Sequence, residues 1–471
     1  LASPALVKAM LVGSAQSMKD GLDRRTGQII GSRPNAVQGF GLVNVETLLD
    51  PGITRQSINQ THTFTSSADP AWAVNYYPVR PDQPVKVTLA WTDAAGEVSA
   101  TAAPLVNNLD LYVTKFFSFG SLSQPCTIQM PGNNPGANEM SNGYHCLGAT
   151  INVEPDTRNN TELAMFQPSD GSRFRVQVVP TSITAEATPN DAPGVQPNQD
   201  FALYVMNGRT RGDFDADGNT DLILRNTNSG ANSFWQMRGT TRVSVVPFQA
   251  AVNLAWHIEG VGDFDRDGHD DILYRNDSGA LAVWKMNRMT YVSGTVFATL
   301  PSTTWRVGGV GDFDGDGKLD IVVRDHGSGA TSGKVVVWLM DGTTKRTEVD
   351  VETRTDLNWE ITGVADMNGD GNEDLVWRDQ AGHNEVWQMG YSTGSASTQI
   401  LHVATLPLNT TADTGWRMAA LGDYNHDGYT DICWNHTVNG SVVFWLMKGT
   451  MITSTSWAPS ETTDWRVVGP R

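Results

Sequence analysis

Short loops rich in aspartate recur in the second half of the chain, and their side chains could bind calcium. Each loop has aspartate or asparagine at positions 1, 3, 5 and 9 and glycine at position 6. Calcium prefers roughly six to eight oxygen ligands at about 2.3–2.6 Å, and alternating short side chains on a tight loop supply them. The carbonyl at position 7 would add a backbone oxygen, and the glycine permits the sharp turn. The spacing therefore predicts a calcium loop.

Five loops share this pattern, so we expect about five calcium ions per chain. Magnesium is disfavoured because so many protein oxygens would leave little of the hydration shell that it prefers to keep. Plain Asp/Gly turns are the alternative, but an ordinary turn does not need oxygens at four fixed positions. The side-chain ligands would be Asp213, Asp215, Asp217, Asp221, Asp263, Asp265, Asp267, Asp271, Asp312, Asp314, Asp316, Asp320, Asp366, Asn368, Asp370, Asp374, Asp423, Asn425, Asp427 and Asp431. The residues that would bind through the position-7 carbonyl are Asn219, His269, Lys318, Asn372 and Tyr429.

The charge of the chain agrees with bound cations. The net charge is −18, and the ligand positions of the five loops alone carry 18 aspartates, so cations would offset much of the repulsion between them. An acidic chain without a Lys/Arg cluster argues against nucleic acid as a partner. His269 and His426 occupy variable loop positions, where we expect exposed side chains without a catalytic role.

The loops belong to a repeat of about 50 residues, which must position them. In each unit a strand that begins with tryptophan precedes the loop, and a second strand, a turn and a strand ending in Trp-x-Met follow it. Units of this length and strand content are typical of β-propeller blades. We expect the repeated tryptophans to pack between blades rather than to stack on a ligand. They are Trp256, Trp305, Trp359, Trp416 and Trp465 in the leading strands, and Trp235, Trp284, Trp338, Trp387 and Trp445 in the Trp-x-Met strands.

The two ends of the repeated region are complementary. The first unit begins at Arg211 without a leading strand, whereas the chain ends in such a strand, which begins at Trp465. Pairing the last strand with the first blade would close a five-bladed ring and remove an exposed edge. The alternative is that the propeller has further blades outside this chain. We favour closure.

The rest of the chain has two other patterns. Residues 4–15 and 45–49 have helical apolar spacing, but two short helices are too little for a domain, so a larger body should receive them. Farther along, alternating runs such as residues 85–91, joined by Pro/Gly/Asn-rich connections, favour an antiparallel sandwich or jelly roll. The expected fold is mainly β, and its predicted domains are a short helical remnant (1–52), a jelly roll (53–208) and a propeller (209–471).

Several features bear on the compartment. No apolar stretch approaches the roughly 20 residues that a membrane-spanning helix needs, and the β-rich composition suits a secreted protein. The first residues lack the pattern of a signal peptide, so we expect the chain to begin within a longer protein. Cys126 and Cys146 lie in a polar insertion, where a disulfide is plausible in an oxidising compartment; two free thiols are the alternative. Cys433 stands alone in an apolar strand.

The repeats resemble the FG-GAP/VCBS family of calcium-loop propeller repeats. That family has Gly-Asp-Phe-Asn/Asp-x-Asp-Gly-x-x-Asp, then Leu/Ile-x-x-Arg and a Val-Trp strand. The resemblance covers about 260 residues, and the fourth unit departs from it with Ala365-Asp366-Met367 in place of Gly-Asp-Phe. The family implies a binding or scaffolding platform, with a protein, a glycan or a cell surface as the partner.

The first two segments resemble the C-terminal part of subtilisin-like (S8 family) serine proteases that carry a jelly roll. Residues 3–8 (SPALVK) resemble the helix after the nucleophile helix, and residues 38–44 (QGFGLVN) resemble the closing element of the catalytic domain. Residues 87–93, 105–111 and 201–205 resemble strands of the jelly roll. The sequence has no Gly-Thr-Ser-Met-Ala nucleophile motif and no catalytic His or Asp motif, so we predict no catalytic residue here and no peptide cleavage by this chain alone.

These patterns together predict the non-catalytic C-terminal region of a secreted subtilisin-like endopeptidase. Its partners would be the upstream protease catalytic domain and a ligand of the calcium-loaded propeller. The alternative is a stand-alone calcium-dependent lectin or adhesin that retains a protease remnant. An independent hydrolase in the jelly roll has no supporting Gly-x-Ser-x-Gly or His-Glu-x-x-His motif. Whether Asn107, Asn108 or Asp110 bind a further ion there is left open.

Overall fold

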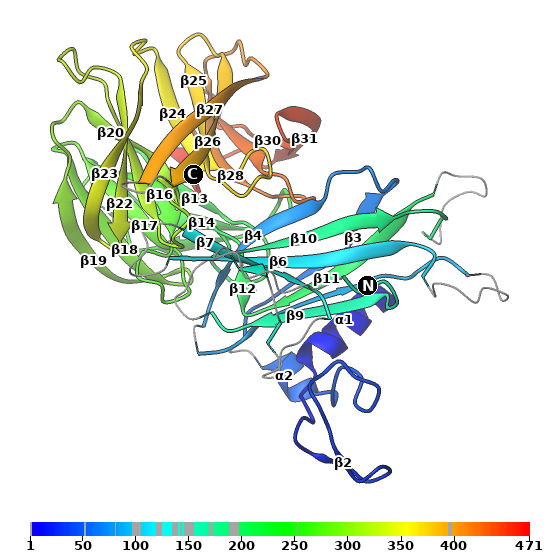
Figure 1. Cartoon of the computed structure of the whole chain (residues 1–471). Helices are drawn as coiled ribbons and strands as arrows, with labels where there is room; N and C mark the ends of the chain where they lie inside the picture. The colour runs from blue at the N-terminus through cyan, green and yellow to red at the C-terminus, as the bar shows by residue number, and fades with distance from the viewer. Residues whose placement is uncertain are drawn as a thin grey trace. The chain divides into compact units, whose positions relative to one another are not determined.

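The structure is a computed structural model of the chain (Figure 1). It divides the chain into two compact units, one of Leu1–Phe116 with Cys126–Arg209 and one of Phe117–Pro125 with Thr210–Arg471. Each unit is described by itself below. The residues that the structure describes are 2–50, 53–80, 82–96, 105–118, 125–133, 140–141, 144–145, 155–168, 173–187, 197–251, 253–393 and 398–471.

The first unit is an antiparallel sandwich of two sheets. One sheet has the order β12-β4-β10-β6-β7-β8 and the other has the order β3-β11-β5-β9. Both sheets contribute to one core, in which Trp72 contacts Phe201 and Phe166 contacts Phe174 across the interface. The strands are β3 (Arg55–Phe64), β4 (Trp72–Pro78), β5 (Val85–Ala90), β6 (Asn108–Ser118), β7 (Pro125–Pro131), β8 (Tyr144–His145), β9 (Thr161–Phe166), β10 (Phe174–Ser182), β11 (Gln199–Met206) and β12 (Gly208–Arg209).

The helices near the N-terminus pack on this sandwich. Helix α1 (Pro4–Ser14) begins with a Ser3 cap, whose hydroxyl accepts the Leu6 N–H at 3.0 Å, and its buried side contacts β5 and β11. Helix α2 (Val45–Leu49) contacts α1 and follows a short hairpin of β1 (Leu22–Asp23) and β2 (Gln28–Ile29). Neither of these two helices, among the residues described, has the length and hydropathy needed to cross a membrane.

The second unit consists of five four-stranded antiparallel sheets, which Figure 1 shows in green to red. We call them blades 1 to 5 in chain order. Blade 1 has β32 (Trp465–Gly469), β13 (Leu222–Asn226), β14 (Asn232–Arg238) and β15 (Thr241–Phe248). The other blades are β16 (Trp256–Gly262), β17 (Asp271–Asn276), β18 (Ala280–Asn287) and β19 (Thr290–Thr299); β20 (Trp305–Gly311), β21 (Asp320–Asp325), β22 (Lys334–Asp341) and β23 (Thr344–Thr353); β24 (Trp359–Ala365), β25 (Asp374–Asp379), β26 (Asn384–Thr393) and β27 (Thr398–Leu408); and β28 (Trp416–Gly422), β29 (Asp431–His436), β30 (Val442–Lys448) and β31 (Met451–Ala458).

The last strand of the chain closes the ring of blades. Strand β32 pairs with β13, with Trp465 opposite Asn226 and Arg466 opposite Arg225. The leading strands contact one another in the order β16, β20, β24, β28 and β32, and β32 contacts β16. The prediction of five blades closed by the C-terminal strand is therefore confirmed.

The core of the propeller lies between neighbouring blades. Residues of blades 2 and 3 form one apolar cluster, and residues of blades 5 and 1 form another around Trp235 and the buried free Cys433. Three further clusters lie between the other neighbouring blades. Each of the five clusters contains the buried methionine of one Trp-x-Met element and one leading tryptophan. The repeated residues thus pack between blades, as their spacing predicts.

Candidate metal centre

Loops 2 to 5 each join the leading strand of a blade to its second strand, and loop 1 precedes the second strand of blade 1, whose leading strand is β32 at the end of the chain. The position-9 aspartate stands at the start of the second strand, and in all five loops it is fully buried. One carboxylate oxygen accepts the backbone N–H of the position-2 residue, as Asp271 does from Phe264 at 3.2 Å. The other oxygen accepts the N–H of the methionine in the Trp-x-Met strand, as Asp271 does from Met286 at 3.0 Å. The same two bonds recur in the other loops, at Asp221, Asp320, Asp374 and Asp431.

The aspartates at the other positions close each loop on itself. The position-1 carboxylate accepts the N–H of the position-6 glycine, as Asp263 does from Gly268 at 2.8 Å. The position-3 side chain accepts the N–H of position 5, and position 5 accepts the N–H of position 7. Gly268 and its four equivalents have φ between 81° and 95°, a conformation that favours glycine. Hydrogen bonds within the loop therefore hold its side-chain oxygens in place.

Three of the loops bring carboxylate oxygens together. In the part of the chain that the structure describes, oxygens of three acidic residues lie within 4.8 Å of one another in loops 1, 2 and 3. In loops 4 and 5 an asparagine takes position 3, so an amide oxygen replaces one carboxylate. The three groups are Asp213, Asp215 and Asp221; Asp263, Asp265 and Asp271; and Asp312, Asp314 and Asp316.

The carboxylates of the loops are electrostatically suited to a cation. Burial, followed by smaller effects such as the charges of neighbouring aspartates, raises the pKa of Asp271 and Asp374 to about 8 and that of Asp221 and Asp431 to about 9. Burial also raises the pKa of Asp320 well above its ordinary value. Clustered, buried carboxylates are costly to ionise without a counter-charge, and a divalent cation supplies one. The donor set thus fits calcium.

The third loop already has positive partners within the chain. The Arg346 guanidinium lies 3.0 Å from Asp314 and 2.8 Å from Asp316. Lys318 lies 3.8 Å from Asp316 and 3.1 Å from Asp341. In loop 2, Lys285 contacts Asp265 at 2.7 Å. The five loops are therefore not equivalent.

Several sequence-based expectations have other outcomes. The position-7 residues donate their N–H groups within the loops, and their carbonyls as ligands stay a prediction. His269 and His426 are both partly buried, not exposed, and the His426 ring lies 3.0 Å from the Asn219 side chain of loop 1. The Cys126–Cys146 disulfide cannot be placed because Cys146 lies outside the described residues. In the sandwich, Asn108 donates to Asp110 at 3.0 Å and Asp110 accepts from Thr181 at 2.6 Å.

Comparison with known proteins agrees with the repeat. The FG-GAP-like repeat family matches four overlapping segments, residues 213–274, 263–323, 312–377 and 366–434. Each segment begins at position 1 of one loop and extends into the second strand that follows the next loop. The chain therefore contains four FG-GAP-like repeats within its propeller. No curated protein is significantly similar to the chain in sequence.

Two solved structures illustrate the structural matches. The Cps50 (Swd1) β-propeller domain of Myceliophteria thermophila is 9% identical with a TM-score of 0.28, and the match covers 50% of this chain and 70% of that one. Raptor of Chaetomium thermophilum is 10% identical with a TM-score of 0.29, and the match covers 74% of this chain and 24% of that one. Likenesses at these scores add nothing to the fold established above.

Proposed function

We propose that this chain is the non-catalytic C-terminal region of a secreted subtilisin-like serine endopeptidase. In this proposal the propeller is stabilised by calcium and binds substrate, matrix or cell surface. The active site would belong to an upstream catalytic domain, because the triad motifs are absent from the sequence given.

The observation that carries the proposal is the apolar surface of the N-terminal segment. Eighteen large hydrophobic side chains are exposed among the described residues, and eight of them lie between residues 2 and 50. Helix α1 buries Ala5, Leu6 and Ala9 against the sandwich and leaves Val7 44% exposed on another side. The other seven are Leu22, Ile29, Val37, Leu42, Val43, Val45 and Leu49. Exposed apolar side chains are expected at an interface, and in this proposal the remainder of a subtilase core would cover those of the N-terminal segment.

The protease part of the proposal is tested on the protein as its source makes it. An antibody to the propeller would isolate the protein, which would then be treated with a fluorophosphonate that labels activated serines. We expect the label on a serine upstream of Leu1, within a Gly-Thr-Ser-Met-Ala-type motif. An unlabelled protein whose upstream coding sequence lacks a subtilase core would overturn this part.

Calcium would act by neutralising the buried carboxylates of the loops. The residues that would hold it are the loop aspartates and asparagines given above, and position 9 would transmit the effect to the Trp-x-Met strand through its bond to the methionine N–H. Metal bound only by the native state adds stability by linkage. We expect about five calcium ions per chain by elemental analysis and a large fall in melting temperature in EGTA. A protein that contains no metal and whose melting temperature is unchanged by EGTA would overturn the calcium assignment.

A stand-alone lectin or adhesin is the second candidate. It is favoured by a pocket that is formed wholly by residues of the second unit, so ligand binding by the propeller needs no protease. A glycan array with the calcium-loaded chain discriminates between the two. Specific sugar binding together with an upstream sequence that lacks a protease would favour the lectin.

A further inference from the structure

A pocket of about 460 Å³ lies on the axis of the propeller. All five leading strands, β16, β20, β24, β28 and β32, contribute residues to its wall. Because these strands form the central ring, the pocket lies within this ring, at the end where the leading strands begin. Its volume is in the range of small-molecule sites, roughly 300–1,000 Å³.

The repeat places one ring of side chains in this pocket. The residue that follows the leading tryptophan occupies the same position in every blade, and all five of these residues line the pocket. They are His257, Arg306, Glu360, Arg417 and Arg466. The residues directly opposite them on the second strands are Arg275, Arg324, Arg378, Asn435 and Arg225. Two blades therefore set arginine opposite arginine, an arrangement that is unfavourable without a counter-charge.

Positive charge exceeds negative charge in this pocket, although the chain as a whole is strongly acidic. Seven arginines and three acidic residues line it. Two of the acids are already paired: Glu259 lies 3.0 Å from Arg275 and 2.6 Å from Arg471, and Asp277 lies 2.9 Å from His257. Glu360 is the third acid.

The other five arginines of the pocket form no direct ion pair with a carboxylate among the described residues. Arg225 and Arg324 donate mainly to backbone carbonyls, such as those of Ala251 and Asp356. Carbonyls satisfy the N–H groups but carry no net charge. Burial, together with the positive charge of Arg324, lowers the pKa of His326 to about 4. The pKa of Arg417 falls to about 10 through burial and the charge of Arg471.

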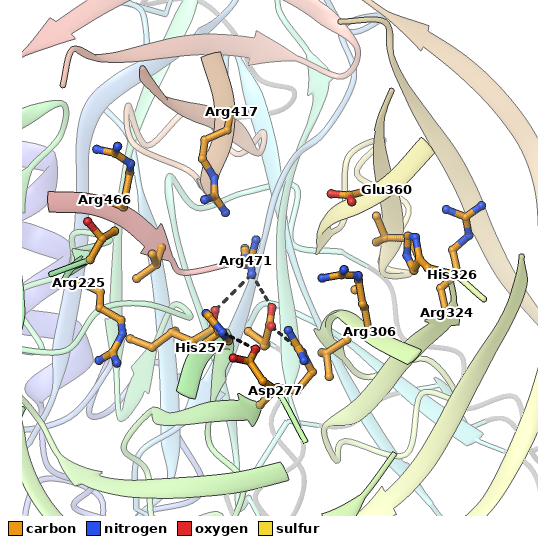
Figure 2. A pocket seen from close by; sticks show the side chains of 18 of the residues that line it. Arg225, His257, Asp277, Arg306, Arg324, His326, Glu360, Arg417, Arg466 and Arg471 are labelled. Carbon is orange, nitrogen blue, oxygen red and sulfur yellow. Dashed lines mark hydrogen bonds and ion pairs between the residues drawn. The ribbon is translucent and has the colours of Figure 1, made fainter. Parts of the chain in front are cut away.

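The side chains of Arg306 and Arg417 are available to contact a ligand. Both residues pair through their backbones within their blades, but in the described parts of the chain neither side chain forms a hydrogen bond or ion pair with another residue. Figure 2 shows them extending from different walls toward the middle of the pocket, where Arg471 also lies. A guanidinium presents several N–H donors in one plane, which match the oxygens of carboxylate, sulfate or phosphate.

We propose that the axial pocket binds a small molecule with oxyanion groups, and that Arg306 and Arg417 are its principal contacts. The ligand would be the size of a monosaccharide or disaccharide, and its carboxylate, sulfate or phosphate groups would supply the missing negative charge. The proposal deepens the ligand-binding role given above, on which it rests, by naming the ligand chemistry and the site.

The test is isothermal titration of the calcium-loaded chain at constant ionic strength. The probes are sodium sulfate, inorganic phosphate kept below the solubility limit of its calcium salt, a uronic-acid disaccharide and the neutral disaccharide of the same size. We expect saturable binding of the charged probes and none of the neutral disaccharide. Tighter binding of the uronic-acid disaccharide than of sulfate identifies an acidic saccharide as the ligand class, whereas equal affinities identify a free oxyanion.

The variants Arg306→Gln and Arg417→Gln test the contacts. Each should weaken binding at least about tenfold, since each removes a charged donor from a partly desolvated site. Arg238→Gln, which removes an exposed arginine outside the pocket, should change affinity less than about twofold. Glu360→Gln should strengthen binding because it removes a negative charge from the pocket wall. This gain separates loss of a contact from loss of folding.

Three results would overturn the proposal. The first is the absence of saturable binding by every charged probe at millimolar concentration. The second is an equal loss of affinity in Arg238→Gln and in the pocket variants, and the third is equal binding of the neutral disaccharide. Calcium content and melting temperature are measured on every sample, so failure of the calcium assignment is distinguished from failure of the pocket alone.

Discussion

The buried carboxylate of Asp271 lies between two backbone N–H groups, one from its own loop and one from Met286 in the third strand of the blade. It accepts from Phe264 at 3.2 Å and from Met286 at 3.0 Å. The equivalent aspartate makes both bonds in all five loops, so each loop is tied to the body of its blade by one side chain.

Replacing this aspartate should unfold its blade more readily. Asp271→Ala leaves two buried N–H groups without an acceptor, and each such group costs about 1–3 kcal/mol. We expect the free energy of unfolding in calcium to fall by about 3 kcal/mol in urea titrations. Asp464→Asn, at an exposed position, is the control and should change it by less than about 0.5 kcal/mol. Equal stability of both variants would contradict the role assigned to Asp271.

Removing calcium should reverse the pH dependence of stability. The pKa of Asp271 and Asp374 is about 8 and that of Asp221 and Asp431 about 9 in the metal-free fold, whereas the ordinary value is 3.8. Between these values the native state binds more protons than the unfolded chain, so stability falls as the pH rises. In EGTA we therefore expect a higher melting temperature at about pH 5.5, which lies inside this window, than at about pH 8.

With saturating calcium the trend should be opposite. Protons compete with the metal for the same carboxylates, so calcium binding weakens as the pH falls and releases protons when it occurs. Melting curves at both pH values, with EGTA and with calcium, measure the four conditions. The same pH trend with and without calcium would show that the loop aspartates do not bind the ion.

The third loop should bind calcium more tightly when its internal cation is removed. The Arg346 guanidinium contacts Asp314 and Asp316, two of the three clustered carboxylates, and competes with a divalent ion for them. Arg346→Gln should raise the affinity of one site by about tenfold in a calcium titration, corresponding to about 1.4 kcal/mol. Lys345→Gln makes the same charge change at a residue that pairs instead with Glu348. It should leave the titration unchanged, and an equal effect of both variants would point to net charge alone.

The junction between the last and first blades should not tolerate a larger side chain at Gly422. A Cβ there would lie 2.8 Å from the Thr220 Cγ2 of blade 1. Gly422→Ala should lower the free energy of unfolding by about 1–3 kcal/mol through overpacking. Gly329→Ala is the control, because no atom lies within 4 Å of a Cβ added there. An unchanged free energy of unfolding in Gly422→Ala would show that the junction between blades 5 and 1 can accommodate the extra methyl group.

The sequence by itself was enough for the local and the repeated features. The nine-residue loops are defined by neighbours in the chain, so the positions of their oxygens and of the turn glycine can be read directly. The period of the tryptophans predicted the blades, and the missing and surplus strands at the two ends predicted the closure that the pairing of β32 with β13 confirms.

Only the tertiary structure shows which residues of different strands and different blades lie close together. The methionine N–H that holds each position-9 aspartate lies 15 to 20 residues away and carries no side-chain signal of its role. Arg306 and Arg417 are more than 100 residues apart in a sequence that has no local cluster of basic residues. They face one pocket because the ring brings equivalent positions of every blade to a common axis, and the residues next to each arginine in the sequence do not show which side chains meet there.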